Sequence, residues 1–351
     1  MPKHAPSQPT ASRKKQHVDL TLSRDVGFRT KTTGLEQWEF LHNALPELDL
    51  AEIDTSARFL DKTLAFPLLV SSMTGGYADA LRINRSLAET CQSVGIGMGL
   101  GSQRQALEDD TYHRTFSVVR EVAPSIPVIG NLGAAEVARL TDAGPALRLV
   151  ELIGADAFAV HLNPLQELLQ PEGSPAFRGV LRGITTLVAG LPVPVIVKEI
   201  GAGLSAGVVR RLLEAGVTII DVAGAGGTSW AGVEILRRKD RAFPDEFWDW
   251  GIPTASAVQN AAALKGQPRK FTLIASGGIA NGLDTAKCIA LGADCTACAR
   301  PMLAALHAGG MTGLRQRLED WQRDLRGAMF LTGSRTITEL QRAPILRRGE
   351  R

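Results

Sequence analysis

One run of seven residues, His161 to Glu167 (HLNPLQE), concentrates hydrogen-bonding and acidic side chains. If the run begins on a strand, His161 and Asn163 share a face, because strand side chains alternate between faces. Gln166 and Glu167 then follow in the loop. Glu167 suits a hard cation such as Mg²⁺, which prefers carboxylate and phosphate oxygens. A lone histidine is more often a satisfied core residue, but its Asn, Gln and Glu neighbours favour a polar binding site.

Lys198 is a second candidate, because it lies in an otherwise apolar run, residues 193–200. Alternation places it on one face with Ile196 and Ile200, while Glu199 takes the other face. A lysine that faces a buried interior must find an anionic partner or lose its proton. We therefore expect Lys198 to form a Schiff base or to balance an electron-rich ring. The alternative is a lysine at the rim that reaches water.

Clustered glycines are the third candidate feature. The chain has 36 glycines in 351 residues, and several follow apolar runs, as in Ser276–Ile279 (SGGI). Glycine lets backbone N–H groups approach phosphate oxygens, and the start of a helix adds the attraction of its dipole. Asn281 is a suitable N-cap residue for such a helix. We interpret the pattern as a phosphate site, the alternative being tight turns that need positive φ.

The elements that must position these residues are eight short apolar runs that alternate with amphipathic helical stretches. The runs are residues 64–73, 95–102, 126–133, 155–163, 193–200, 217–224, 271–278 and 293–300. Their nearly continuous apolar character is typical of parallel strands covered on both faces. The alternation predicts an α/β fold, a single (β/α)₈ TIM barrel, with chemistry at the C-terminal ends of the strands. A doubly wound open sheet is the competing fold.

Three regions are expected along the chain. Residues 1–62 form a basic N-terminal arm and extension, and residues 63–331 form the barrel, with an insertion near 231–253. Residues 332–351 form a basic C-terminal tail. A helix is expected over residues 313–331, and its apolar face packs either on the chain itself or on a second copy.

The formal net charge of +3 is unevenly distributed. Residues 1–31 hold seven basic and two acidic side chains, and residues 335–351 hold five and two, so the body between them is acidic. A protein that binds nucleic acid would usually carry positive charge on its folded body, so no nucleic-acid partner is expected. The N-terminal arm is either a solvated tail or a segment that closes over an anionic ligand.

The sequence contains no run of 18 apolar residues, and its first 30 residues lack the apolar core of a secretory signal. The four cysteines do not form a disulfide framework at this length. Cys295 and Cys298 lie three apart in a predicted strand and so point to opposite faces, which argues against a shared metal or disulfide. We expect a cytoplasmic protein with no membrane partner.

The motifs at the predicted strand ends resemble those of type 2 isopentenyl-diphosphate isomerases. They are RKKQH (13–17), SSMTGG (71–76), GSQR (101–104), HLNPLQE (161–167), QPEG (170–173), VKEIG (197–201), DVAGAGGTSW (221–230), DWGIPTA (249–255), SGGI (276–279) and ARP (299–301). The likeness extends from Arg13 to Leu331, and the combination is specific although each glycine motif alone is not. The chain departs from the pattern at Gln16, where an acidic residue is common, and at Cys298.

The resemblance implies an enzyme of isoprenoid biosynthesis that interconverts isopentenyl diphosphate and dimethylallyl diphosphate on reduced FMN, with NADPH as reductant and Mg²⁺ as a further cofactor. It implies catalytic roles for Gln166, Lys198 and His161, with Glu167 as the metal ligand. FMN would be held by Ser72, Met73, Thr74, Ser102, Asn131, Lys198, Thr228, Gly277, Gly278, Ala299 and Arg300. Substrate would be bound by Arg13, Lys14, Ser102, Gln103, Arg104, His161, Asn163 and Gln166. A homo-oligomer, tetramer or octamer, is also implied.

Two other classes of function are consistent with a barrel. An FMN-dependent oxidase or dehydrogenase of small hydroxy acids would need a histidine base and arginines placed for a carboxylate, and His161 is the only histidine at a predicted strand end. A non-catalytic binding or assembly protein would not need Lys198, Gln166 and Glu167 together.

Overall fold

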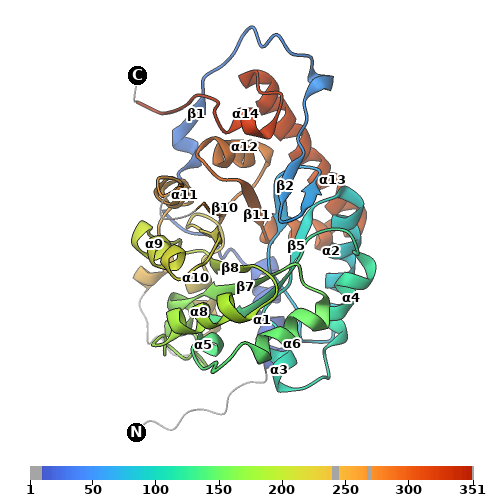
Figure 1. The fold of residues 1–351 in the computed structure, drawn as a ribbon, viewed down its shortest axis with the longest axis vertical. Helices are drawn as coiled ribbons and strands as arrows, with labels where there is room; N and C mark the ends of the chain where they lie inside the picture. The colour runs from blue at the N-terminus through green and yellow to red at the C-terminus, as the bar shows by residue number, and fades with distance from the viewer. Residues whose placement is uncertain (1–9, 239–244, 267–269, 350–351) are drawn as a thin grey trace.

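The fold is a closed parallel β-barrel, seen in a computed structural model that describes residues 10–238, 245–266 and 270–349 (Figure 1). The eight strands follow one another round the barrel in chain order, which confirms the predicted TIM barrel over the open sheet. They are β4 (Leu68–Val70), β5 (Gly97–Gly99), β6 (Val128–Gly133), β7 (Ala157–Leu162), β8 (Val195–Glu199), β9 (Ile219–Asp221), β10 (Thr272–Ser276) and β11 (Cys295–Cys298).

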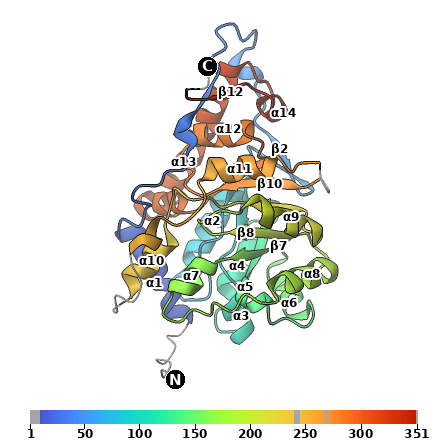
Figure 2. The same ribbon diagram turned by 90° about the vertical axis from the view of Figure 1, so that its left-hand side faces the viewer.

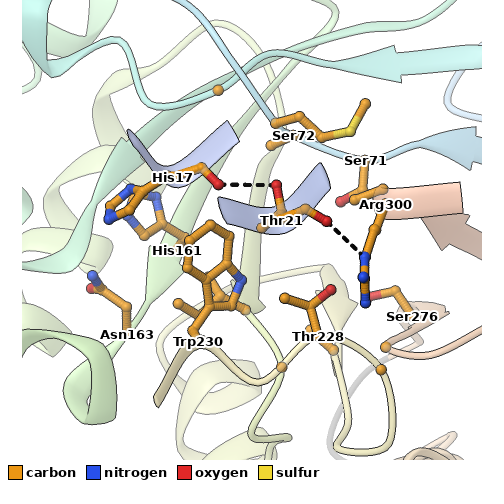
Figure 3. Close-up of a pocket in the computed structure, with 18 of the residues that line it drawn as sticks. His17, Thr21, Ser71, Ser72, His161, Asn163, Thr228, Trp230, Ser276 and Arg300 are labelled. Atoms are coloured by element: carbon orange, nitrogen blue, oxygen red, sulfur yellow. Dashed lines mark hydrogen bonds between the residues drawn. The ribbon is translucent and has the colours of Figure 1, made fainter. Parts of the chain in front are cut away.

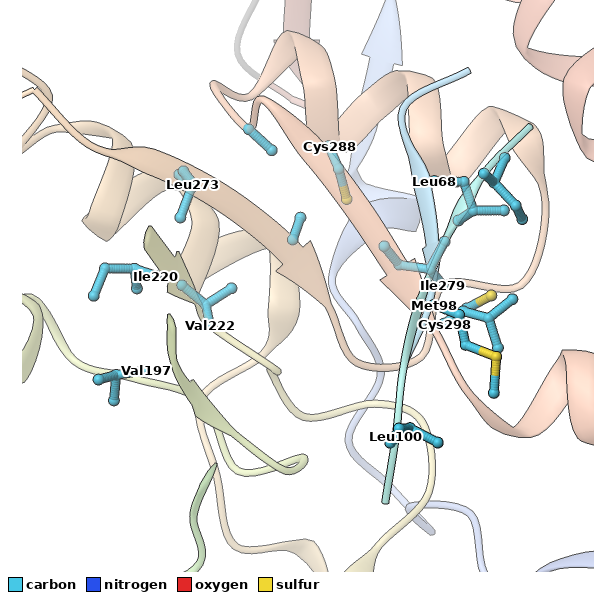
Figure 4. Packing of buried hydrophobic residues seen from close by; sticks show 14 of the residues in the cluster. Leu68, Met98, Leu100, Val197, Ile220, Val222, Leu273, Ile279, Cys288 and Cys298 are labelled. Carbon is cyan, nitrogen blue, oxygen red and sulfur yellow. The ribbon is translucent and has the colours of Figure 1, made fainter. Parts of the chain in front are cut away.

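The strands are nearly continuous in apolar sequence because both of their faces are buried. One face contributes Leu69, Ile129 and Ile196 to a cluster inside the barrel. The other face contributes to the layer between strands and helices, where Val197 and Ile220 lie on neighbouring strands (Figure 4). This double burial is the physical reason why the apolar runs identified the strands.

A ring of helices covers the outside of the barrel. The predicted cap is present: the side chain of Asn281 accepts a hydrogen bond from the N–H of Asp284. Another helix of the ring begins in the same way, where the side chain of Ser205 accepts from the N–H of Val208. The helices of the ring are α2 (Ala80–Val94), α4 (Arg114–Val122), α6 (Gly144–Ile153), α8 (Val180–Gly190), α9 (Ala206–Glu214), α11 (Thr254–Ala262) and α12 (Gly282–Ala290).

The helix expected over residues 313–331 is the second part of α13 (Arg300–Thr332), whose backbone turns at Gly310 (φ 60°). Leu314, Trp321 and Met329 from the expected apolar stripe are all buried. The helix packs on α2 and α12, so its apolar face is covered by the chain itself.

The N-terminal end of the barrel is closed by a hairpin of β2 (Ala57–Phe59) and β3 (Lys62–Leu64). Phe59 and Leu64 belong to the interior cluster of the barrel. Space for a ligand therefore remains only toward the C-terminal ends of the strands.

The chain on either side of the barrel is folded where it is described. Helix α1 (Thr10–Ser23) lies near α10 (Trp230–Arg237), and at the other end of the molecule β12 (Ile345–Arg347) pairs antiparallel with β1 (Trp38–Phe40) beside α14 (Ile337–Leu340) (Figure 2). The expected tail thus adds a strand to the extension. Residues 1–9 of the expected arm, 239–244 of the expected insertion and 350–351 of the expected tail lie outside the described residues.

Shorter helices complete the fold. They are α3 (Arg104–Glu108), α5 (Ala134–Val137), α7 (Pro164–Leu169) and the 3₁₀ turns η1 (Leu35–Gln37), η2 (Leu50–Glu52) and η3 (Asp245–Asp249). Across the described ranges, no helix has the length and apolar character that crossing a bilayer requires.

Candidate active site

The C-terminal ends of the barrel strands surround a cavity of about 640 Å³, a size typical of small-ligand sites. Helix α1 forms one wall, through side chains spaced three or four residues apart, among them Lys14, His17 and Thr21. Figure 3 shows His17 and Thr21 gathered with side chains from the barrel, including His161, Thr228 and Arg300. Residues 10–23 are therefore docked on the barrel and do not form a solvated tail.

Most of the predicted site residues meet at this cavity. Those that line it are Arg13, Lys14, Ser72, Met73, Ser102, Arg104, Asn131, His161, Asn163, Gln166, Glu167, Lys198, Thr228, Gly277, Gly278, Ala299 and Arg300. Residues separated by up to 287 positions are thus brought together, as expected for the ends of parallel barrel strands.

Two predicted residues, Thr74 and Gln103, do not line the cavity. Gln103 is fully buried, where its Nε2 donates to the carbonyl of Leu149 (3.1 Å) and its Oε1 accepts from the N–H of Asn131 (3.0 Å). It supports the end of β6. Thr74 is buried too, and its carbonyl accepts from the side chain of Asn84 (3.3 Å) and from the N–H of Gly101 (3.0 Å).

The glycine turn after β10 has the geometry that the sequence suggested. Gly277 and Gly278 have φ values of 98° and 71°. A Cβ on Gly277 would lie 2.0 Å from the carbonyl oxygen of Gly224, so a side chain cannot be accommodated there. The close packing of two strand ends requires these glycines, and the turn leads directly to the capped start of α12 at Gly282.

Lys198 lies on the wall of the cavity with its side chain only 10% exposed, which rules out a rim lysine in open solvent. Its Nζ lies 3.7 Å from Oδ2 of Asp221, a carboxylate that is itself buried. The expected anionic partner is therefore present. Asp221 balances the ammonium charge inside the barrel, which is the condition for keeping such a charge buried.

The hydrogen bonds of Asn131 fix the state of His161. Asn131 donates its Nδ2 to the carbonyl of Leu100 (3.2 Å), so its Oδ1 accepts from Nδ1 of His161 (2.8 Å). Burial, together with the nearby charges of Lys198 and Lys14, lowers the pKa of His161 to about 3. The imidazole is thus neutral near pH 7, and its Nε2 is left as a hydrogen-bond acceptor.

Gln166 is held by two neighbours. Its Oε1 accepts from Nδ2 of Asn163 (3.1 Å), and its Nε2 donates to Oε1 of Glu234 (2.9 Å). Glu234 is completely buried, and burial alone would raise its pKa. A hydrogen bond from His17 and the charge of Arg237 outweigh that effect and lower the pKa of Glu234, so the residue is an anion that only accepts.

Sequence reasoning missed Glu234 and His17, which join α1 to α10. Nε2 of His17 lies 2.9 Å from Oε1 of Glu234, and its ring meets that of Trp230 edge-on, with centroids 5.3 Å apart. Trp230 ends the DVAGAGGTSW motif, and a helix beginning there places position i+4, Glu234, on the same face. That spacing is the signal that could have identified Glu234.

Basic side chains crowd the wall formed by α1. Nζ of Lys14 donates to the carbonyls of Gly75 (2.7 Å) and Ser102 (2.6 Å), and burial together with the charge of Arg13 lowers the pKa of Lys14 to about 7. Burial and the neighbouring Arg104 lower the pKa of Arg13. An anionic ligand at this wall would relieve the mutual repulsion of these cations.

Arg300 anchors the other end of α1. Its Nε donates to the carbonyl of Thr21 (2.9 Å), and its Nη2 donates to the carbonyl of Arg24 (3.2 Å). The end of α1 is therefore tied to the start of α13.

Glu167 has one oxygen that accepts from Asn163 (3.0 Å) and one that accepts from the N–H of Ser174 (2.7 Å). Within the described ranges, no group of three or more His, Cys, Asp or Glu residues is arranged to hold a metal. The buried Oδ1 of Asn163, which lines the cavity, has no hydrogen-bond partner among the described residues. A hard cation here would need oxygens from its ligand or from water besides Glu167.

All four cysteines are buried and free. Cys295 packs inside the barrel and Cys298 in the outer layer, which confirms the prediction that they point to opposite faces.

Comparison with known proteins gives two results at the level of sequence. Residues 172–347 match the family model described as FMN-dependent dehydrogenase. Proteins named isopentenyl-diphosphate delta-isomerase are similar over nearly the whole chain: that of Chlorobaculum parvum is 51% identical (97% of this chain, 98% of the relative), that of Chlorobium luteolum 50% (95% and 94%), and that of Cronobacter sakazakii 46% (97% and 98%).

Among solved structures, mandelate oxidase is similar in fold. Its complex with (S)-2-phenylpropionate has a TM-score of 0.66 at 21% identity, covering 95% of this chain and 94% of that one. Another crystal structure of the same enzyme has a TM-score of 0.66 at 19% identity, covering 96% of both chains. At this identity the likeness shows the barrel fold alone.

Proposed function

The chain belongs to the isopentenyl-diphosphate delta-isomerase family, and we propose that the cavity formed by α1 and the strand ends is where it interconverts isopentenyl diphosphate and dimethylallyl diphosphate. One observation of the structure carries this placement. The cavity has a buried, charge-balanced lysine on its wall and a cluster of crowded cations at α1. A lysine suits an electron-rich ring, and the cations suit a diphosphate.

The cavity residues fit FMN, the cofactor of the matched family. Gly277 and Gly278 leave backbone without side chains beside the start of α12, which suits a phosphate. Lys198 would lie near the ring, and Asn131 and Ser102 would offer polar contacts from the ends of β6 and β5. Reduced FMN supplies an electron-rich surface that can give and take a proton.

The chain's own residues would prepare the double-bond shift, in which a proton is added at one carbon and removed from another. Glu234 and Asn163 hold the amide of Gln166 in one orientation at the cavity. His161 presents an acceptor nitrogen, and the cations of α1 hold the diphosphate. Helix α1 forms one wall of the cavity and would limit the access of water, which would trap a carbocation.

Further parts of the proposal follow from the resemblance. Glu167 would bind Mg²⁺ together with oxygens of the diphosphate, because Mg²⁺ is usually held by few carboxylates and by substrate phosphates. NADPH would supply the reducing equivalents. The protein would act in the cytoplasm as a homo-oligomer, a tetramer or an octamer.

The decisive experiment follows the flavin and the substrate together. The purified protein should be yellow, should bleach with NADPH, and should then convert isopentenyl diphosphate only when Mg²⁺ is present. Small hydroxy acids, including mandelate and lactate, serve as the control substrates. A colourless protein that FMN cannot reconstitute would refute the proposal, and so would a flavoprotein that oxidises hydroxy acids but does not isomerise the diphosphate.

A further inference from the structure

Three polar side chains on adjacent strands form a buried row beside the cavity. Lys198 of β8 and Asp221 of β9 are paired in the barrel register. Ser276, at the end of β10, donates its hydroxyl to Oδ1 of Asp221 at 2.5 Å. Asp221 is 3% exposed, and it does not line the cavity, whereas Lys198 and Ser276 do. The carboxylate therefore lies behind the lysine as seen from a ligand.

The contacts of Asp221 leave one oxygen for the lysine. Oδ1 accepts from Ser276 and from the N–H of Ala223 (3.2 Å). Oδ2 lies 3.7 Å from Nζ of Lys198. Placing a carboxylate in the barrel wall is costly unless it is paired, because a buried ion loses its hydration. Among the described residues, Lys198 is the basic partner of Asp221, so the charge of Asp221 is directed at the cavity wall.

Glu199 cannot substitute for Asp221 in this role. It follows Lys198 on the opposite face of β8, and its Oε2 accepts from the N–H groups of Ile200 and Gly201 at 2.6 Å each, and from Ala202. Its carboxylate is therefore already hydrogen-bonded to the backbone of the turn that follows β8.

The carbonyl of Glu199 accepts a hydrogen bond from Nζ of Lys198 (2.5 Å) and holds the ammonium from the chain side. We propose that Asp221 is a positioning residue that pairs with this ammonium from the next strand and sets the net charge that a bound flavin meets at the cavity wall. The inference rests on the proposed function, because it takes the ligand to be FMN. With Asp221 present, the pair is close to neutral. Without it, the ammonium is unbalanced and attracts the more negative, reduced ring more strongly than the oxidised ring.

The test is the midpoint potential of bound FMN in the variant Asp221→Asn, which keeps the size of the side chain and removes its charge. A neighbouring charge shifts an ionisation equilibrium by about 1–3 pKa units. We take the lower end, since Asp221 acts from behind Lys198, and expect the affinity for reduced over oxidised FMN to rise about tenfold. For a two-electron couple this is a rise of about 30 mV.

Three further variants make the result specific. Asp221→Ser, a second neutral substitution, should raise the potential as well and guards against a folding defect peculiar to asparagine. Asp221→Glu keeps the charge and should stay close to the wild type. Asp294→Asn is the matched control, because Asp294 pairs with Lys265 (2.6 Å) just before β11, at the opposite end of the barrel.

The outcomes separate the inference from the proposed function. A rise in both neutral variants, with Asp221→Glu and Asp294→Asn unchanged, supports the role of Asp221. A potential that is unchanged or lower in the neutral variants overturns it, while flavin binding and isomerase activity of the wild type leave the proposed function standing. A wild-type protein that binds no FMN refutes the proposed function, and the inference with it.

Discussion

The variant Glu234→Gln tests whether a residue without ligand contact controls the chemistry. Glutamine has nearly the same shape as glutamate but can both donate and accept. The anion in the native protein only accepts, and this forces Gln166 to donate its Nε2 (2.9 Å). In the variant, two amides face each other, and Gln166 can rotate so that its oxygen and nitrogen exchange places.

The magnitude follows from the strength of that one contact. A hydrogen bond to a charged group contributes about 1.5–3 kcal/mol. If the productive orientation of Gln166 loses this stabilisation, kcat should fall about 10- to 150-fold, at 1.36 kcal/mol for each factor of ten. KM should change little, because the basic side chains of α1 that we propose to hold the diphosphate are not substituted.

The assay is steady-state conversion of isopentenyl diphosphate by reduced enzyme, with FMN content measured in parallel. Removing one partner of a buried ion pair costs about 3–5 kcal/mol, and we expect the lower end of this range because Arg237 keeps its second carboxylate partner, Glu172 (3.2 Å). Glu172→Gln is the matched control, since it removes the other carboxylate from Arg237 and leaves Gln166 held. The reasoning is refuted if kcat of Glu234→Gln equals that of Glu172→Gln while both retain FMN.

Three further predictions concern the arm, the metal and pH. Lys14→Ala removes the two contacts of α1 to the carbonyls of Gly75 and Ser102, so KM for the diphosphate should rise about tenfold with FMN retained; loss of FMN at unchanged KM would contradict this. Glu167→Gln should raise the Mg²⁺ concentration for half-maximal activity about tenfold, and an unaltered Mg²⁺ titration would remove Glu167 as a ligand. His161 has a folded pKa of about 3 against 6.5 when unfolded, so below pH 6.5 only the unfolded chain takes up this proton. The free energy of unfolding should therefore fall as pH drops from 6.5 toward 3, by about 5 kcal/mol at most. Denaturant unfolding of His161→Asn should show a shallower fall with pH, and parallel pH curves for the variant and the wild type would refute the neutral histidine.

The barrel was predictable because each of its strands is covered on both faces, which leaves a continuous apolar run in the sequence. Helix α1 was not predictable from such a pattern. Its sequence, TASRKKQHVDLTLS, has no apolar stripe, and contacts of Lys14, His17 and Thr21 with the barrel hold it in place. Helices of this kind depend on tertiary contacts rather than on periodicity.

Within the site, contiguous motifs predicted which residues lie near the cavity better than they predicted where each side chain points. The GSQR motif suggested that Gln103 contacts a ligand, but the chain turns into α3 at this point and directs Gln103 under β6. Glu234 shows the opposite case. It lies beyond the last residue of a motif, and a glutamate in a helix is expected to face water. Its complete burial follows from partners on α1 and α7, which no local pattern reveals.

Helix α1 contacts both ends of the cavity, so its basic residues also have a structural role besides the proposed binding of the ligand. Lys14 binds the loops after β4 and β5, His17 contacts the carboxylate that orients Gln166, and Arg300 ties the end of the helix to the start of α13. Lifting α1 would remove the His17 contact from Glu234 at the same time as it opened the cavity to water. The contact that joins α1 to the cavity wall is therefore also a contact to the carboxylate that holds Gln166, so a movement of α1 would change the surroundings of Gln166.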